Sequence, residues 1–370
     1  MLRSSAVGLA LLAVWVRSGS EKQQTKCHCM NLVLCQPMAR NEEVKKDKEV
    51  LVFDNGGKDW KHYMWSIITI VVASQQYDPE LFCHAHAEGV QLLMKVTLPP
   101  VRTIWTKEKM TEWVNNQVKL VKTHQMDGIN LHLDQVVIRY SPESKKITEA
   151  VQQIFTAIHK EIRQSKVIVN VPWSPHCLYG RCYEYAKLQA SSDSLFVMSY
   201  LMHTTNTEDC FAKPNAPYDK VSSGISKYIK LGISPSKLIL GVPWFGVDYT
   251  CKKLHEAGGC ELINKPNKQT CNVKSGDTIP YKTVMTLLPR AVSQKFWEND
   301  LQVPSFTYMS QGKSHEVWYD NPRSIAAKAS LVKKFKLAGI GAWTGNFLNY
   351  TYNATVAMQT QNMWNALYKS

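Results

Sequence analysis

The segment Met126-Asp-Gly-Ile-Asn-Leu-His-Leu-Asp-Gln135 lies between two stretches of helix length, at 107–123 and 147–165. Its centre, 128–133, alternates apolar with polar residues, as a β-strand does when its two faces differ. A short strand between two helix-length stretches is typical of a parallel sheet whose faces are covered by helices. The segment therefore predicts one repeat of a fold in which strands and helices alternate.

The same unit recurs along the chain. Eight short runs rich in Val, Ile and Leu are separated by longer stretches, and they lie at 50–54, 67–73, 90–96, 128–133, 166–173, 194–200, 237–244 and 339–344. Further helices are expected at 224–231 and 324–337. Eight β-then-α units favour a closed (β/α)8 TIM barrel over an open doubly wound sheet. We predict an α/β fold in which residues 21–370 form a single barrel domain.

One connection, 245–338 between the seventh and eighth runs, is far longer than the others. Its length exceeds an ordinary βα connection, so we expect a small insertion subdomain on one rim of the barrel. The aromatic residues of this insertion either form one wall of a cleft at the active rim or pack the insertion's own core. They are Tyr281, Trp297, Tyr308, Trp318 and Tyr319.

The first twenty residues predict a secretory signal peptide. Arg3 precedes the apolar run 7–16, and small residues follow at 18–20. The run is shorter than the ~20 residues that a membrane span needs, so we expect no membrane attachment after the signal is removed. Sequons for N-glycosylation at Asn349 and Asn353 agree with the secretory pathway.

Ten cysteines in a chain that enters this pathway indicate disulfide bonds rather than metal ligands. Cys27, Cys29 and Cys35 imitate part of a zinc site, but the second pair of ligands that would close it is missing. We therefore predict neither a metal nor a cofactor. The net charge of +14 comes from basic residues that are scattered, without a nucleic-acid-binding motif, so no nucleic-acid partner is expected.

The polar residues of the opening segment mark a candidate site. Alternation places Asn130, His132 and Asp134 on one face of the strand, and in a barrel that face points inward. Three polar side chains in succession are costly to bury unless they are hydrogen-bonded. Their place at the carboxyl end of a barrel strand is where barrel enzymes carry their active sites.

This segment resembles the signature of glycoside hydrolase family 18, Asp-x-x-Asp-x-Asp-x-Glu, in its chitobiase form Asp-Gly-Ile-Asn-Ile-Asp-Ile-Glu-Gln. The likeness runs from Cys27 to the carboxyl terminus. It includes Phe-Val-Met-Ser-Tyr at 196–200, Gly-Val-Pro-Trp-Phe-Gly at 241–246 and Gly-Ile-Gly-Ala-Trp at 339–343. The resemblance implies a chitinase-like barrel, monomeric and lysosomal or secreted, whose partner is an N-acetylglucosamine-containing oligosaccharide.

The family's mechanism gives each matching residue a role. The 2-acetamido oxygen of the substrate attacks the anomeric carbon, so no enzyme nucleophile is needed. The resemblance implies that Tyr200 is the catalytic tyrosine that holds the acetamido group and that Trp343 is the sugar-binding floor. Asp127 and Asn130 match the chitobiase form of the motif and are implied to bind substrate.

Two central positions depart from the family. His132 stands where the family has the Asp that orients the acetamido group, and Asp134 stands where it has the Glu that donates the proton. The shorter side chain moves the acid back by about 1.5 Å, and a displacement of ~1 Å can cost ~10²-fold in rate. His132 removes a negative charge beside a developing cation, typically a ~10²–10³-fold loss. Alternatively, His132 acts as a general acid that Asp134 orients.

We therefore predict a weakly active or inactive pseudoenzyme that binds chitobiose-type oligosaccharides in glycan degradation. The alternatives are an active exo-chitobiase that releases reducing-end N-acetylglucosamine and a non-catalytic interaction protein. The resemblance also implies a changed disulfide, because Ser192 replaces the cysteine that accompanies Cys182 in the family. We expect Cys182 to pair with Cys177.

Overall fold

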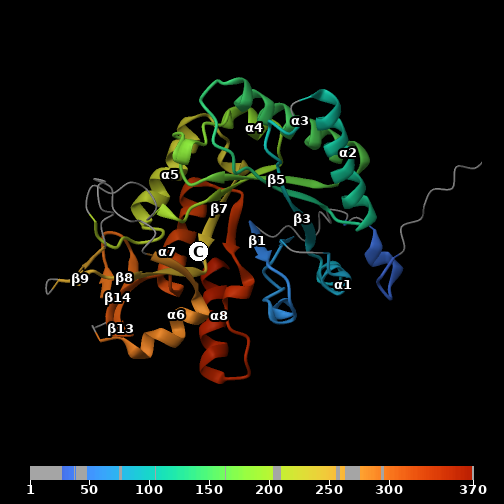
Figure 1. The fold of residues 1–370 in the computed structure, drawn as a ribbon. Helices are drawn as coiled ribbons and strands as arrows, with labels where there is room; N and C mark the ends of the chain where they lie inside the picture. Colours follow the sequence, from blue (N-terminus) through green and yellow to red (C-terminus); the bar gives the residue numbers. More distant parts are fainter. Residues whose placement is uncertain are drawn as a thin grey trace, which may run out of the picture.

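The chain folds around a closed barrel of eight parallel strands (Figure 1), in the order β1-β15-β7-β6-β5-β4-β3-β2. The computed structural model describes residues 27–36, 38, 48–74, 77–104, 106–162, 164–202, 210–255, 259–262, 276–292 and 296–368. The barrel strands are β1 (Glu49–Asp54), β2 (Ile70–Ala73), β3 (Gln91–Thr97), β4 (Gly128–His132), β5 (Lys166–Pro172), β6 (Ser194–Met198), β7 (Leu238–Pro243) and β15 (Gly339–Trp343). Each overlaps one predicted run, which confirms the (β/α)8 fold. The predicted signal at 1–20 lies outside the described residues.

Helices cover the outside of the barrel. They are α1 (Pro79–Ala87), α2 (Lys107–Thr123), α3 (Pro142–Glu161), α4 (Tyr185–Ala190), α5 (Tyr218–Lys230), α7 (Pro322–Phe335) and α8 (Ala354–Tyr368). Side-chain caps and a proline at the first turn start α3 and α7, because Ser141 and Asn321 accept hydrogen bonds from backbone N–H groups there. None of the described helices is long and apolar enough to cross a membrane.

The strand β4 begins where only glycine fits. Gly128 has a φ of +141°, and a Cβ atom there would lie 1.9 Å from the carbonyl oxygen of Lys166 on β5. Without a side chain at this point, β4 can approach β5 and keep the register in which His132 lies opposite Asn170. Gly128 therefore helps to fix the height of the candidate site residues in the barrel.

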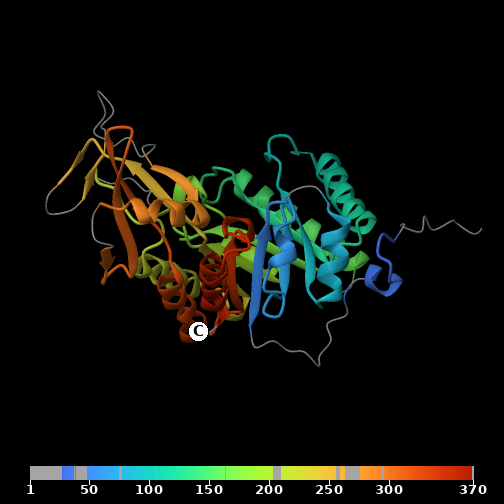
Figure 2. The same ribbon diagram turned by 90° about the horizontal axis from the view of Figure 1, so that it is seen from below.

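Between β7 and β15 the chain forms the predicted insertion. Its five-stranded antiparallel sheet, in the order β11-β8-β14-β13-β12, lies beside the barrel on the side away from the amino-terminal segment (Figure 2). The strands are β8 (Phe245–Thr250), β11 (Gly276–Pro280), β12 (Phe296–Glu298), β13 (Val303–Ser310) and β14 (Lys313–Trp318), with helix α6 (Tyr281–Leu287) after β11. Two short strands, β9 (Lys253–Leu254) and β10 (Cys260–Glu261), pair separately. Helix α7 packs against α5 and α8 in the barrel's outer layer.

Most of the insertion's aromatic residues pack in hydrophobic cores. Tyr281, Tyr308, Trp318 and Tyr319 are all buried, and Arg323 lies over the ring of the partly buried Trp297 at 3.9 Å from its centroid. Their burial supports the packing alternative for these four residues, and a role as a wall of a sugar-binding cleft stays a prediction. Tyr281, Tyr308 and Tyr319 belong to the hydrophobic cluster that also contains the barrel strands, whereas Trp318 belongs to a separate cluster in the insertion. These side chains therefore help to join the insertion to the barrel as well as to fill its own core.

Disulfide bonds account for the cysteines that resembled a metal site. Cys27 bonds to Cys35 and Cys29 bonds to Cys83, so the sulfur atoms of the amino-terminal cluster are used in covalent pairs. A third bond joins Cys177 to Cys182, which confirms the pairing expected from the loss of the cysteine at Ser192. A fourth, Cys251–Cys260, closes a turn of the insertion.

Glu316 on β14 makes the stability of the insertion dependent on pH. The side chain is 5% exposed beside an apolar cluster, and burial raises its pKa from 4.5 to about 7. The folded protein therefore binds this proton more tightly than the unfolded chain, and stability is gained as pH falls from above 7 towards 4.5. Above pH 7 the ionised carboxylate costs up to about 3 kcal/mol.

We expect Glu316→Gln to raise the free energy of unfolding by about 1–3 kcal/mol at pH 8 and to change it little at pH 5. Urea unfolding of both proteins between pH 5 and pH 8 measures this difference. Glu112→Gln on the exposed face of α2 is the control and leaves the pH dependence unchanged. A parallel pH dependence in wild type and Glu316→Gln would contradict the assignment.

Candidate functional site

The inward-facing residues of β4 lie at different depths in the barrel. Asn130 is fully buried, and its amide and that of Asn170 on β5 donate to each other's carbonyl oxygens at 2.8 Å. This reciprocal pair joins β4 to β5, and the substrate-binding role expected of Asn130 stays a prediction. His132 lies one step nearer the carboxyl rim and is partly exposed.

The surroundings of His132 favour its neutral form. Burial is the main cause that lowers the pKa of its imidazole, and the cations Lys95 and Arg181 lower it further, while Asp134 acts in the opposite direction. In the described part of the chain, no hydrogen bond joins His132 to Asp134. The alternative in which Asp134 orients His132 as a general acid therefore lacks the contact that it requires.

Asp134 forms an ion pair with Arg181, whose guanidinium donates to its carboxylate. The Asp134 side chain is 56% exposed and that of Arg181 is 20% exposed. Arg181 belongs to the loop after β5 that the Cys177–Cys182 disulfide closes. The same loop is tied to β6 by Tyr179, whose hydroxyl donates to the carbonyl oxygen of Leu201 at 2.8 Å. This loop therefore bridges the carboxyl ends of three strands.

The structure adds Lys95, which the sequence reasoning missed. Lys95 pairs with Asn130 in the β3–β4 register, so its side chain points into the barrel. Its ammonium lies 4.9 Å from the centroid of the Trp343 ring, and burial lowers its pKa. A lysine at an inward position near the carboxyl end of β3 was the signal in the sequence that could have found it.

The two aromatic residues expected to bind sugar lie at the ends of β6 and β15. Trp343 is partly exposed and packs at 4.8 Å from the ring of Phe53. Tyr200 is 7% exposed and meets Phe245 edge to face at 5.6 Å. Burial raises the pKa of the Tyr200 phenol well above its ordinary range, so the hydroxyl keeps its proton. Both residues share the carboxyl rim with His132 and Lys95.

Asp127 lies at the other end of β4 and does not join this group. The Leu92 amide donates to its carboxylate at 2.7 Å, the Met38 amide donates at 3.0 Å, and a ring nitrogen of His86 lies 2.9 Å away. The side chain is 1% exposed. We correct its expected substrate-binding role to a structural one: Asp127 fastens the amino-terminal segment to the start of β3 and β4.

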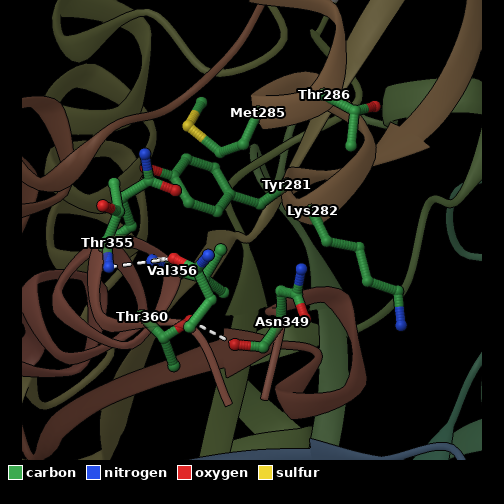
Figure 3. A pocket seen from close by; sticks show the side chains of 10 residues that line it. Tyr281, Lys282, Met285, Thr286, Asn349, Thr355, Val356 and Thr360 are labelled. Carbon is green, nitrogen blue, oxygen red and sulfur yellow. Dashed lines mark hydrogen bonds between the residues drawn. The ribbon is translucent and has the colours of Figure 1, made fainter. Parts of the chain in front are cut away.

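A cavity of about 320 Å³ lies apart from this rim, between α6 and the start of α8 (Figure 3). Tyr281 and Met285 face Thr355 across it, and both sequon residues, Asn349 and Asn353, line it. We call the carboxyl rim around Lys95, His132 and Trp343 the barrel mouth. None of these three residues lines the cavity. Without paired acid and base groups it is a poor site for hydrolysis, so we place the candidate chemistry at the mouth.

The fold and the site together define a (β/α)8 protein whose polar groups gather at the carboxyl rim, as in barrel enzymes. The chain belongs to the glycosyl hydrolases family 18, whose sequence profile matches residues 101–346. It is 40% identical over 343 residues to di-N-acetylchitobiase of Mus musculus, covering 92% of both chains. It is 39% identical over 345 residues to di-N-acetylchitobiase of Homo sapiens, covering 93% of this chain and 88% of the human one.

Solved structures agree with the fold. The chitinase of Chromobacterium violaceum matches with a TM-score of 0.66 at 19% identity, covering 86% of this chain and 98% of that one. The chitinase of Rhizomucor miehei also matches with a TM-score of 0.66, at 16% identity, covering 87% and 99%. Together with the chitobiase relatives, these likenesses confirm the family and the barrel that the sequence predicts.

The electrostatic coupling at the mouth can be measured on His132 directly. We expect its imidazole to titrate below its ordinary value of 6.5 and Lys95→Met to raise that pKa, because a neighbouring cation is removed. NMR titration of the histidine resonances measures both values. Lys282→Met at the separate cavity is the matched control and leaves the His132 titration unchanged. An unchanged titration in Lys95→Met would disprove the coupling.

The sequons also give a prediction. Asn353 is exposed, and its side-chain carbonyl accepts from the Thr355 amide at 3.0 Å, whereas Asn349 is partly buried. We expect the protein secreted from mammalian cells to carry N-glycans at this edge of the cavity. Enzymatic deglycosylation followed by mass spectrometry measures them, and Asn353→Gln and Asn349→Gln each remove one. If the wild-type protein shows no loss of mass on deglycosylation, neither sequon is used.

Proposed function

We propose that the barrel mouth binds N-acetylglucosamine-containing oligosaccharides of the chitobiose type and hydrolyses them weakly at most. The protein acts as a monomer in glycan degradation, in the lysosome or outside the cell after passage through the secretory pathway. The observation that carries this proposal is the ion pair between Asp134 and Arg181. The Arg181 guanidinium binds the Asp134 carboxylate, and Asp134 stands at the position of the family's general acid.

Sugar recognition is supported by the two aromatic residues at the rim. The neutral phenol of Tyr200 can donate a hydrogen bond to an acetamido oxygen, which is the role of the matching tyrosine in the family. The indole of Trp343 offers a partly exposed ring at the end of β15. Aromatic rings and a few convergent polar groups are typical of a binding site for a small ligand.

The contacts of Asp134 do not favour proton transfer to the leaving group. Asp134 reaches about 1.5 Å less far than a glutamate, and its charge is matched by Arg181 rather than directed at a substrate oxygen. A general acid must also lie within hydrogen-bond reach of the oxygen that it protonates.

The charge-stabilising step is poorly supported as well. In the family's mechanism the attack of the acetamido oxygen produces a positive oxazolinium, and an anion beside it lowers the barrier. His132 supplies no negative charge there, and Lys95 and Arg181 both act on it electrostatically as cations. Like charges near a developing cation raise the barrier, which supports slow or absent hydrolysis.

Restoring the two family residues tests the proposal. We expect His132→Asp/Asp134→Glu to release N-acetylglucosamine from reducing chitobiose at pH 5 at least ~10²-fold faster than wild type. A second version with Arg181→Met added removes the ion-pair partner of the new glutamate. Wild-type turnover near that of these variants, lost in Asp134→Ala, would instead identify an active exo-chitobiase.

Two controls accompany this assay. His28→Asp/Asp300→Glu makes the same kinds of substitution at exposed positions, one in the amino-terminal segment and one in the insertion, and leaves the rate at the wild-type level. Isothermal titration calorimetry with the same oligosaccharide shows whether wild type binds it. Absence of both binding and turnover in wild type would favour a non-catalytic interaction protein over a glycan-binding one.

A further inference from the structure

Lys95 presents an unusual charge at the barrel mouth. Its side chain is half buried on β3, and in the part of the chain that the structure describes no carboxylate pairs with its ammonium. The ring of Trp343 lies against it, with the ring centroid 4.9 Å from the ammonium nitrogen. A cation over an aromatic face gains about 0.5–2 kcal/mol, whereas a buried charge is usually paired because desolvation is costly. The ammonium is therefore in a position to bind an anion.

Among the described residues, the charged groups around His132 do not supply that anion. Asp134 is matched by Arg181, so this pair is balanced. His132 lies within the electrostatic reach of Lys95, Asp134 and Arg181, and it is neutral at neutral pH. These groups come from β3, β4 and the loop after β5, and their sum is one uncompensated positive charge. At the family's orienting position an aspartate would cancel it, but His132 does not.

The position of Lys95 also decides which sugars the site favours. Its ammonium lies over the indole of Trp343, on the ring that the family uses as a sugar floor. A neutral sugar that stacked there would have to displace the ammonium or bury it further without a partner. A sugar with a negative group would form an ion pair with it instead, and ion pairs out of water are worth more than exposed ones.

We propose that the mouth selects acidic N-acetylglucosamine-containing oligosaccharides, in which a sulfate ester or a carboxylate on the sugar pairs with Lys95. This inference rests on the proposed function and narrows its ligand class. The indole of Trp343 and the phenol of Tyr200 bind the sugar, and the ammonium of Lys95 forms an ion pair with its anionic group. Arg181 forms an ion pair with Asp134, so its role is to hold the loop after β5 in place and not to bind the ligand.

Calorimetry on the mature protein distinguishes the possible ligands. The probes are chitobiose, chitobiose with one 6-O-sulfate, chitobiose with one sugar oxidised to a uronic acid, and inorganic sulfate. We expect at least one of the two acidic disaccharides to bind ~10-fold or more tightly than the neutral one. The preference weakens with added salt, because ion pairs are screened. Inorganic sulfate alone binds far more weakly than the sulfated sugar.

Substitutions separate the charge from the shape of the site. Lys95→Met keeps a chain of similar length over Trp343 but removes the charge, so we expect it to abolish the preference while neutral chitobiose still binds. His132→Asp supplies an internal partner for Lys95 and is expected to abolish the preference as well. Lys282→Met, at the separate cavity, is the matched control and retains it. Thermal unfolding confirms that each variant is folded.

A pH series adds a second readout. Protonation of His132 on acidification places a second cation beside Lys95, with Asp134 and Arg181 as the other charged groups facing it. A sulfate ester stays ionised on acidification, so its affinity rises as pH falls through the lowered pKa of His132. The rise is lost in His132→Gln, which cannot take up the proton.

The outcomes are distinct. Equal affinity for neutral and acidic disaccharides overturns the acidic-ligand inference and leaves glycan binding standing. Affinity for inorganic sulfate equal to that for the sulfated sugar also overturns it, because the sugar then contributes nothing. A preference for acidic disaccharides that survives in Lys95→Met overturns the role of Lys95, because another group then binds the anion. Failure of every disaccharide to bind overturns both this inference and the proposed function.

Discussion

Closure of β1 onto β15 is the constraint on which the rest of the structure depends. Glu49 lies opposite Gly339, and a Cβ atom on that glycine would lie 2.0 Å from the carbonyl oxygen of Glu49. Glycine therefore lets the first and last strands approach closely enough to pair. Once the sheet is closed it has no free edge, and the carboxyl ends of β3, β4, β5 and β15 open at the same mouth. Lys95, His132 and Trp343 meet there for that reason.

The barrel fixes the positions of these side chains but not their charges. A family 18 site that promotes hydrolysis needs an acid and an anion at adjacent inward positions of β4, because the reaction develops positive charge. Here the same positions carry His132 and an Asp134 that is paired with Arg181. The architecture of a glycosidase is thus combined with an electropositive mouth, which illustrates why function follows from the site rather than from the fold.

The loop after β5 links two of the departures from the family. Ser192 is buried, and its hydroxyl donates to the Leu188 carbonyl oxygen at 2.8 Å, so the cysteine that the family has there is replaced by a satisfied polar group. Cys182 bonds to Cys177 instead and closes a short loop that contains Arg181. That loop brings the guanidinium to Asp134. Arg181 therefore links the Cys177–Cys182 loop to Asp134.

The sequence by itself determined the eight barrel strands, the insertion before the last of them, the inward orientation of Asn130 and His132, and, through the family resemblance, the Cys177–Cys182 bond. Alternation along a strand follows from local covalent geometry, so it can be read from a few residues. The tertiary structure alone decided that Asp127 lies at the opposite rim, that Arg181 pairs with Asp134, and that Lys95 lies over Trp343. These contacts join residues far apart in the chain, and they depend on how the closed strands are staggered around the barrel.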